Sequence, residues 1–392
     1  MSAAVAHAEP DWLTERRREG ASLASELELP TQKTKGWEFT DLSALELDAF
    51  EQGTATVSGL DVAADADGVT VMALAEAAER HPELVRERLG SVVQARDVFV
   101  ARNAERWRDG VLVHIAAGAR LAEPLRLEIE AGDGEEAHWR TLVVLEEGAE
   151  AEVFERYTSA GEGLFDGVVE LIVGPGANLR YVCDQELSTG AWAFSTQRAE
   201  IERDGALEWV ALGFGSARGK TRMETKLAGQ GSSAKVTGAY AGDGRQHLDF
   251  DTTQEHAAPH TNSDLAFRGV LAGRATAVWS GMIKVDRDAQ QTDAFQESRN
   301  LLLSKRSHAD AIPGLEIEAD DVRCTHAAAV AQVDREQLFY LTSRGLTTEL
   351  ATRLVVEGFL ASLVERLPEG ALREELAESL EARVTELLDS GY

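Results

Sequence analysis

The sequence predicts a mainly β protein: a parallel β-helix, or β-solenoid, flanked by helical N-terminal and C-terminal domains. Short alternating or β-branched apolar runs fill the chain from about residue 109 to residue 304. A turn glycine followed by alternating apolar positions recurs among these runs, and helical periodicity is confined to the two ends. We therefore expect a mixed, mostly helical domain over residues 1–105, a β-helix core over 106–320 and a helical domain over 321–392.

The N-terminal region combines helices with short irregular segments. Residues 10–29 place apolar side chains among Glu and Arg, which is typical of a surface helix ended by Pro30. Residues 72–89 have the pattern of a second helix with an interruption at Pro82. Between them, residues 37–42 (WEFTDL) spread their apolar side chains as in short, mixed structure.

The repeat in the middle of the chain predicts stacked coils. Its glycines follow one another after 30, 28, 29, 26 and 42 residues: Gly118, Gly148, Gly176, Gly205, Gly231 and Gly273. A unit of this length cannot bury its own apolar face, so it must stack on its neighbours. The 42-residue gap is expected to hold a further coil or an inserted loop around residues 247–264. A β-sandwich also has regularly spaced strands and turns, and it is the alternative.

The last part of the chain predicts three helices. Asp334 is placed as the N-cap of a first helix that ends at Gly345. A second helix opens at Thr347 or Thr348, and a last amphipathic helix covers residues 372–388. So short a helical domain cannot build a large core alone. Its apolar stripes must therefore meet the solenoid or another protein.

Charge and cysteine content exclude several classes of function. With 39 Lys plus Arg against 68 Asp plus Glu, the net charge of −29 argues against nucleic acid and anionic lipid as partners. Two cysteines, Cys183 and Cys324, make neither a disulfide framework nor a four-thiolate metal site within one chain. Neither a secretory signal nor an apolar run long enough to span a membrane is present, so we expect a cytoplasmic protein.

Cys324 and His326 are the strongest candidates for metal ligands. Their i, i+2 spacing puts both side chains on one face if the segment is a strand. Two ligands leave a metal site incomplete, so the others would come from another chain. The alternative is a small buried thiol and a histidine with a structural role. The acidic stretch before Cys324 opposes a lowered thiol pKa, whereas Arg323 favours one.

Two further groups carry weaker signals. His256 and His260 have a metal-ligand spacing, but Pro259 disfavours the helix that would bring them together, so a hydrogen-bonding loop is expected. Asp249, Asp251 and Asp264 could hold Ca²⁺ or act as a carboxylate pair, as in polysaccharide-cleaving β-helices.

Several blocks of the sequence resemble the SufB/SufD family of iron–sulfur cluster assembly proteins, and the similarity runs through nearly the whole chain. The blocks are residues 37–42 (WEFTDL), 300–304 (NLLLS), 313–317 (PGLEI), 320–326 (DDVRCTH) and 338–346 (LFYLTSRGL). Within this family, the Cys-x-His pattern, the short chain and the few cysteines are most like the SufD branch.

The resemblance implies a right-handed parallel β-helix and a non-catalytic scaffold subunit. It implies pairing with a SufB-type paralogue, or with a second copy of the chain, through the β-helix, and docking of a SufC-type ATPase through the C-terminal helices. Cys324 and His326 would lie near the SufB interface and share transient iron or a nascent cluster, with no cofactor stably bound to the chain alone. Whether a flavin associates stays open. A SufB-like or self-pairing scaffold and, less favoured, a carbohydrate-active β-helix enzyme are the alternatives.

One departure from the family pattern concerns the backbone after His326. The family usually has CSHGATVGQ where this chain has CTHAAAVAQ, so Ala327 and Ala331 replace glycines. A left-handed backbone at either alanine would cost about 1 kcal/mol or more and would change the direction in which His326 points.

Overall fold

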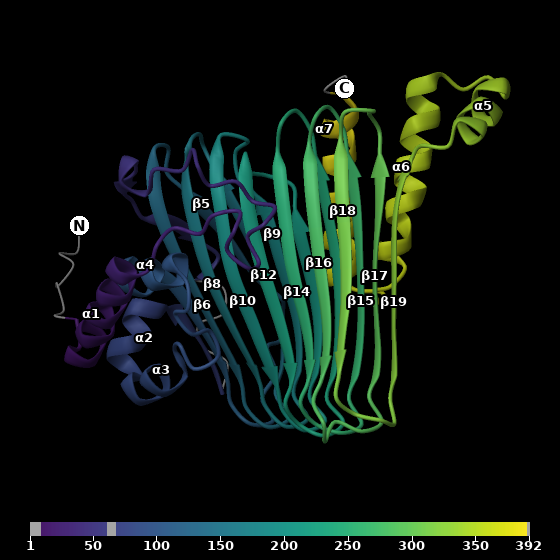
Figure 1. Ribbon diagram of the computed structural model, residues 1–392. Coiled ribbons are helices and arrows are strands. Elements are labelled where there is room, and N and C mark those ends of the chain that lie inside the picture. The colour runs from purple at the N-terminus through teal and green to yellow at the C-terminus, as the bar shows by residue number, and fades with distance from the viewer. Residues whose placement is uncertain (1–8, 61–67, 390–392) are drawn as a thin grey trace.

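The computed structural model describes residues 9–60 and 68–389, so the outermost parts of both predicted terminal domains lie outside the described residues. Within them the chain forms a β-solenoid of about eight turns, with helices at both ends (Figure 1). The predicted fold class is therefore confirmed. The sandwich alternative is wrong, because successive coils pair their strands in parallel, whereas sandwich sheets are antiparallel.

Each coil contributes one strand to each of two sheets. Sheet A has ten strands: β1 (Glu51–Gln52), β3 (Val69–Ala73), β4 (Asp109–Ile115), β6 (Glu135–Leu145), β8 (Gly163–Val173), β10 (Ala191–Ile201), β12 (Arg218–Leu227), β14 (His247–His256), β16 (Thr276–Val285) and β18 (His308–Ile317). Sheet B has nine: β2 (Ala55–Ser58), β5 (Leu125–Ala131), β7 (Glu150–Ser159), β9 (Asn178–Glu186), β11 (Ala206–Gly213), β13 (Ser233–Gly242), β15 (Asn262–Leu271), β17 (Asp293–Leu302) and β19 (Arg323–Gln332).

The turns from sheet A to sheet B explain the uneven glycine spacing. From β4 onwards, every one of these turns except the last, between β18 and β19, has one residue with a left-handed backbone, in order Gly118, Gly148, Gly176, Asp204, Gly231, His260 and Gln291. His260 thus stands where the glycine repeat has a gap, and a whole coil, β14 and β15, fills that gap. Gly273 belongs to the opposite row of turns, from sheet B to sheet A, so the interval of 42 residues spans one and a half coils.

The two ends of the solenoid differ. The core between the sheets is filled by large buried side chains such as Trp139, Trp209 and Trp279. At the N-terminal end, the antiparallel strands β2 and β3 pair with β5 and β4 and cover the first coil. At the C-terminal end, the outer edges of β18 and β19 pair with no other strand of the described chain. One end of the solenoid is therefore capped and the other is open.

The N-terminal helices gather beside the capped end of the solenoid, and the last two helices pack on the outer face of sheet B. The helices of the described chain are α1 (Asp11–Glu26), the short 3-10 helix η1 (Leu47–Ala49), α2 (Leu74–Arg80), α3 (Pro82–Arg88), α4 (Val98–Arg106), α5 (Arg335–Ser343), α6 (Thr348–Val364) and α7 (Ala371–Asp389). The predicted caps are confirmed: Asp334 and Thr347 accept hydrogen bonds from the first turns of α5 and α6. No helix in the described ranges is long and apolar enough to cross a lipid bilayer.

The sequence prediction did not anticipate a strap, residues 27–50, that packs on the outer face of sheet A. Trp37 stacks on Phe99 with ring centroids 5.4 Å apart, and it also contacts Phe194 of β10. Thr40 donates a hydrogen bond to Asp249 of β14. The strap thereby joins the N-terminal helices to the middle of the solenoid.

The predicted boundary between the core and the C-terminal domain at residue 320 needs correction. The solenoid continues through β19 to Gln332, so Cys324 and His326 lie in its last strand and not at the start of the helical domain. The strand was difficult to recognise because it lies at an edge and contains the run Ala327–Ala329, which lacks apolar alternation.

Candidate functional site

Cys324 and His326 lie on the inward-facing row of β19, at the open end of the solenoid. In the parallel pairing with β17 they stand opposite Ala294 and Gln296, which are 1% and 0% exposed inside the core. No coil of the described chain covers them from the other side. Cys324 is half-buried against the small cluster that contains Ala294, and His326 is exposed. The structure thus places both predicted ligands on one face of a strand.

The environment of Cys324 favours the neutral thiol. Burial raises the pKa of this thiol, and the nearby carboxylate of Asp293 raises it further. The positive charge of Arg323 does not reverse this effect. In the isolated chain, Cys324 is therefore poorly prepared to act as a thiolate ligand.

The remaining ligands of a metal at this site would have to come from elsewhere. Among the described residues, no group of three or more His, Cys, Asp and Glu side chains is arranged to hold a metal ion. Cys183 lies far from Cys324. It is buried on β9, and the strands β11, β13, β15 and β17 of sheet B lie between β9 and β19. Burial also raises the pKa of Cys183, and its sulfur accepts a hydrogen bond from Gln197.

The last coil leaves an open mouth, which we define as the inward residues Leu315, Ile317, Cys324, His326 and Val330. Leu315 and Ile317 of β18 pair with the buried Ile283 and Val285 of β16, so they continue a core row. Leu315, Ile317 and Val330 are nevertheless 38%, 39% and 43% exposed, because no further coil in the described ranges follows β18 and β19. Apolar core positions and two unpaired strand edges together form a surface suited to another chain.

A second apolar surface, the helical patch, lies on α5 and α6. It consists of Phe339, Tyr340, Leu350 and Leu354, whose exposed fractions are 75%, 57%, 43% and 43%. In Figure 1, α5 projects beyond β19, whereas α6 runs back along the solenoid. The rest of α6 packs on α7 and sheet B through residues such as Val356 and Leu360.

The alanines that follow His326 introduce no backbone strain. Both Ala327 and Ala331 lie within β19, and neither is among the residues with a left-handed backbone. The conformational cost of a left-handed backbone at these alanines therefore does not arise.

The candidate pair His256 and His260 does not form a metal site. His256 is buried and hydrogen-bonded through Nδ1 to Thr261 (2.7 Å) and through Nε2 to Ser263 (2.9 Å). Burial lowers the pKa of His256 to about 4, so its ring is neutral at neutral pH. His260 lies at a turn, and its backbone N–H donates to Gln290. The expected hydrogen-bonding role of this loop is confirmed.

Two of the three aspartates lie on sheet A and the third lies on sheet B. Asp249 of β14 forms an ion pair with Lys220 (2.9 Å) beneath the strap, and Asp251 lies farther along the same strand. Asp264 is on β15 of sheet B, where it pairs with Arg366. The three therefore do not converge on one site: Asp264 is apart, whereas Asp249 and Asp251 both lie near the ammonium group of Lys220, at 2.9 and 4.0 Å.

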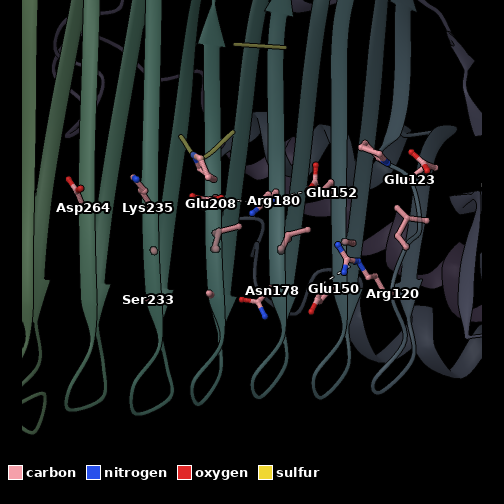
Figure 2. Close-up of a pocket in the computed structure, with 18 of the residues that line it drawn as sticks. Arg120, Glu123, Glu150, Glu152, Asn178, Arg180, Glu208, Ser233, Lys235 and Asp264 are labelled. Atoms are coloured by element: carbon pink, nitrogen blue, oxygen red, sulfur yellow. Dashed lines mark hydrogen bonds and ion pairs between the residues drawn. The ribbon is translucent and has the colours of Figure 1, made fainter. Parts of the chain in front are cut away.

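A groove of about 590 Å³ crosses the outer face of sheet B near the turns (Figure 2). Its charges neutralise one another across the strands: Arg180 lies 2.6 Å from Glu152 and 2.9 Å from Glu208. Lys235 donates to a backbone carbonyl near the end of α6. The described residues that line it include no aromatic side chain, although sugar-binding grooves need them. The groove gives no support to a carbohydrate-active enzyme.

A buried ionic cluster between α4 and sheet A was missed from the sequence. His138 lies between Asp166 (Nδ1 to Oδ2, 3.0 Å) and Glu136 (Nε2 to Oε1, 3.1 Å). Arg102 and Arg106 of α4 bind Glu136 at 2.9 and 2.7 Å. The cluster fastens α4 to the solenoid. Its members come from β6, β8 and α4, so no local spacing reveals it.

These groups shift one another's pKa values. Burial opposes the charged form of His138, but its hydrogen bond to Asp166 and the nearby carboxylate of Glu136 outweigh this and raise its pKa. Burial also opposes ionisation of Glu136, yet His138 and Arg102 lower its pKa to about 2. Burial dominates at Asp166 and raises its pKa to about 6.

Comparison with known proteins gives one consistent family. Residues 128–359 match the SufBD core domain of SUF-system FeS cluster assembly proteins, and residues 48–127 match the SufBD N-terminal region. The iron–sulfur cluster assembly protein SufD of Bacillus subtilis is 30% identical, over 96% of this chain and 95% of that protein. An iron–sulfur cluster assembly SufBD family protein of Mycobacterium tuberculosis is also 30% identical, over 90% of this chain and 89% of its own. With its solenoid, its two helical ends and these matches, the chain belongs to the SufBD family of iron–sulfur cluster assembly proteins.

Proposed function

We propose that this chain is a SufD-type, non-catalytic scaffold subunit that pairs through its open mouth and carries an ATPase on its helical patch. The pairing partner is a SufB-type paralogue, and the ATPase is of the SufC type. Transient iron or a nascent cluster is the cargo at Cys324 and His326, with the remaining ligands supplied by the partner. The observation that carries the proposal is that both residues lie on the inward row of an uncapped coil.

The open mouth supports pairing with another solenoid. A partner that adds strands to β18 and β19 would bury Leu315, Ile317 and Val330 and satisfy the free backbone groups of both edges. Cys324 and His326 would then lie inside the joint. This chain supplies two ligands, Cys324 and His326, and further ligands from the partner would complete the metal site.

The helical patch supports a separate partner. Phe339 and Tyr340 are more exposed than aromatic side chains normally are, and aromatic residues of this kind act as anchors at protein interfaces. α5 projects beyond β19 (Figure 1), and its exposed aromatic residues are distinct from the inward residues of the mouth. The two surfaces therefore suit a complex in which one subunit contacts two others.

The test is co-expression with SufB-type and SufC-type subunits, followed by affinity capture and native mass measurement. Leu315→Asp should abolish retention of the SufB-type subunit and leave the SufC-type subunit bound, and Phe339→Ala should do the reverse. Leu23→Asp and Phe39→Ala are matched controls, because Leu23 of α1 is as exposed as Leu315 (38%) and Phe39 lies on the strap (42%). Equal retention of both partners by Leu315→Asp and Leu23→Asp would contradict pairing through the mouth.

The role of His326 is tested separately. His326→Ala should fold and assemble normally, since the side chain is exposed, but should lower cluster transfer to an apo-protein under anaerobic conditions. Cys324→Ser tests the second ligand in the same assay. Insoluble His326→Ala protein would instead support a purely structural histidine.

A self-pairing scaffold is the second candidate, because the same mouth would serve a second copy of the chain. The native mass of the chain purified alone distinguishes them. A stable dimer that Leu315→Asp converts to monomer would favour self-pairing, and a monomer that dimerises only with the SufB-type subunit would favour the first proposal.

A further inference from the structure

Asp184 is a carboxyl group buried beneath α7. It lies on the outward face of β9 and is 3% exposed. Around it, α7 packs on an apolar bed: Phe154, Val182, Val210 and Leu212 of sheet B meet Leu376 and Leu380 of the helix. The site is separate from both the mouth and the helical patch.

The hydrogen bonds of Asp184 do not satisfy a carboxylate. Its Oδ2 accepts one bond from the hydroxyl of Ser379 on α7, at 3.0 Å. Its Oδ1 is buried and has no hydrogen-bond partner among the described residues. An ionised carboxylate with one hydrogen bond in an apolar bed is costly, whereas the neutral acid is tolerated far better.

The charged groups around Asp184 do not compensate. Arg156 of β7 stands opposite Asp184 in the strand register, but its guanidinium is bound to Glu186. Arg126 of β5 is bound to Glu375 of α7. Glu128 of β5 is the register partner of Arg156, and burial raises the pKa of this glutamate.

These surroundings affect the titration of Asp184 in opposite directions. Burial and the carboxylates of Glu186 and Glu375 raise the pKa of Asp184, and Ser379 and Arg156 lower it. The result is a pKa of about 7. The shift agrees with what the hydrogen-bond geometry indicates independently.

We propose that Asp184 is a protonation-dependent latch for α7. The neutral carboxyl holds the helix against sheet B, and loss of its proton to solvent loosens the helix. Because α7 packs against α6, the latch acts on the helical domain as a whole. The inference depends on the contacts of α7 within this chain and holds whether or not a partner binds the helical patch.

The direction of the effect follows from linkage. An exposed aspartate has a pKa near 3.9, so the docked helix binds the proton more tightly than the undocked one. Docking therefore weakens as the pH rises through the interval between these two values, by about tenfold per pH unit, and the effect levels off above about pH 7. Between pH 5.5 and 7.5 the expected change is about 20-fold.

Hydrogen exchange of the full chain tests the latch. After correction for the intrinsic pH dependence of exchange, protection of the α7 amides should fall about 20-fold from pH 5.5 to 7.5, while protection of α1 stays constant. Asp184→Asn keeps the shape of the side chain but cannot ionise. It should protect α7 equally at both pH values.

Glu378→Gln is the matched control, because Glu378 is exposed on the same helix and should leave the response of wild type intact. An unchanged α7 in wild type, or the wild-type response retained in Asp184→Asn, would overturn the proposal. If the asparagine variant does not fold, the comparison of α7 with α1 in the wild-type chain still decides the question.

Discussion

The buried carboxylate of Glu136 gives the sharpest stability prediction. Glu136→Gln keeps the size of the side chain but removes the charge that faces Arg102, Arg106 and His138. The pKa of Glu136 falls from its ordinary value of 4.5 to about 2, which corresponds to about 3 kcal/mol of folding stability at neutral pH. Removing one partner of a buried ion pair typically costs about 3–5 kcal/mol, so two routes give a similar magnitude.

The pH dependence of this effect has a definite sign. A carboxylate whose pKa is lower in the folded chain stabilises the fold fully above about pH 4.5, and this stability is lost as the pH falls towards 2. The difference between wild type and Glu136→Gln should therefore be about 3 kcal/mol at pH 7 and about 2 kcal/mol at pH 3.5.

Urea unfolding followed by tryptophan fluorescence measures this difference. Trp107 and Trp139 are buried close to α4 and report on the region. Glu130→Gln, at an exposed position of β5, is the control and should lie within about 0.5 kcal/mol of wild type. A Glu136→Gln midpoint equal to that of the control, or a difference that grows on acidification, would refute the reasoning.

Four further variants test other parts of the fold. The pKa of His256 is about 4, so wild type should lose about 2 kcal/mol through this residue between pH 7 and pH 5, and His256→Gln should lose this dependence in urea titrations. Gly238→Ala would place a methyl group 2.2 Å from the Phe267 ring and should cost about 1–3 kcal/mol in thermal unfolding, whereas Gly358→Ala, in open space on α6, should stabilise by up to about 1 kcal/mol. Trp37→Ala should release the strap, detected as faster proteolysis between residues 27 and 50, and cleavage at the wild-type rate would argue against its docking role.

The solenoid could be predicted because its signal repeats. Each coil must bury the same kind of row, so turn glycines such as Gly148 and Gly176 recur at nearly constant spacing. The prediction lost the register where a non-glycine took the left-handed position. Asp204, His260 and Gln291 do so at three turns, and Asp and His tolerate that conformation better than most residue types.

The candidate site could be predicted only in part. The i, i+2 spacing of Cys324 and His326 gave a shared face, and β19 confirms it. β19 belongs to the last coil, and no other coil of the described chain stacks on it. This position depends on the whole solenoid, so no local sequence pattern reveals it. The same reason hides His138 and Asp166, which are 28 residues apart and meet only when consecutive coils stack.

The strap has a consequence for synthesis of the chain. Thr40 docks on Asp249, which is 209 residues later in the sequence. At about 5–20 residues per second, a ribosome needs roughly 10–40 seconds to make that stretch. During this time the first coils have already been made, but the surface of sheet A on which the strap packs is still incomplete. Trp37 is therefore not yet fully buried. The nascent chain therefore presents an aromatic segment that chaperones can bind, and completion of β14 is the earliest moment at which the strap can close.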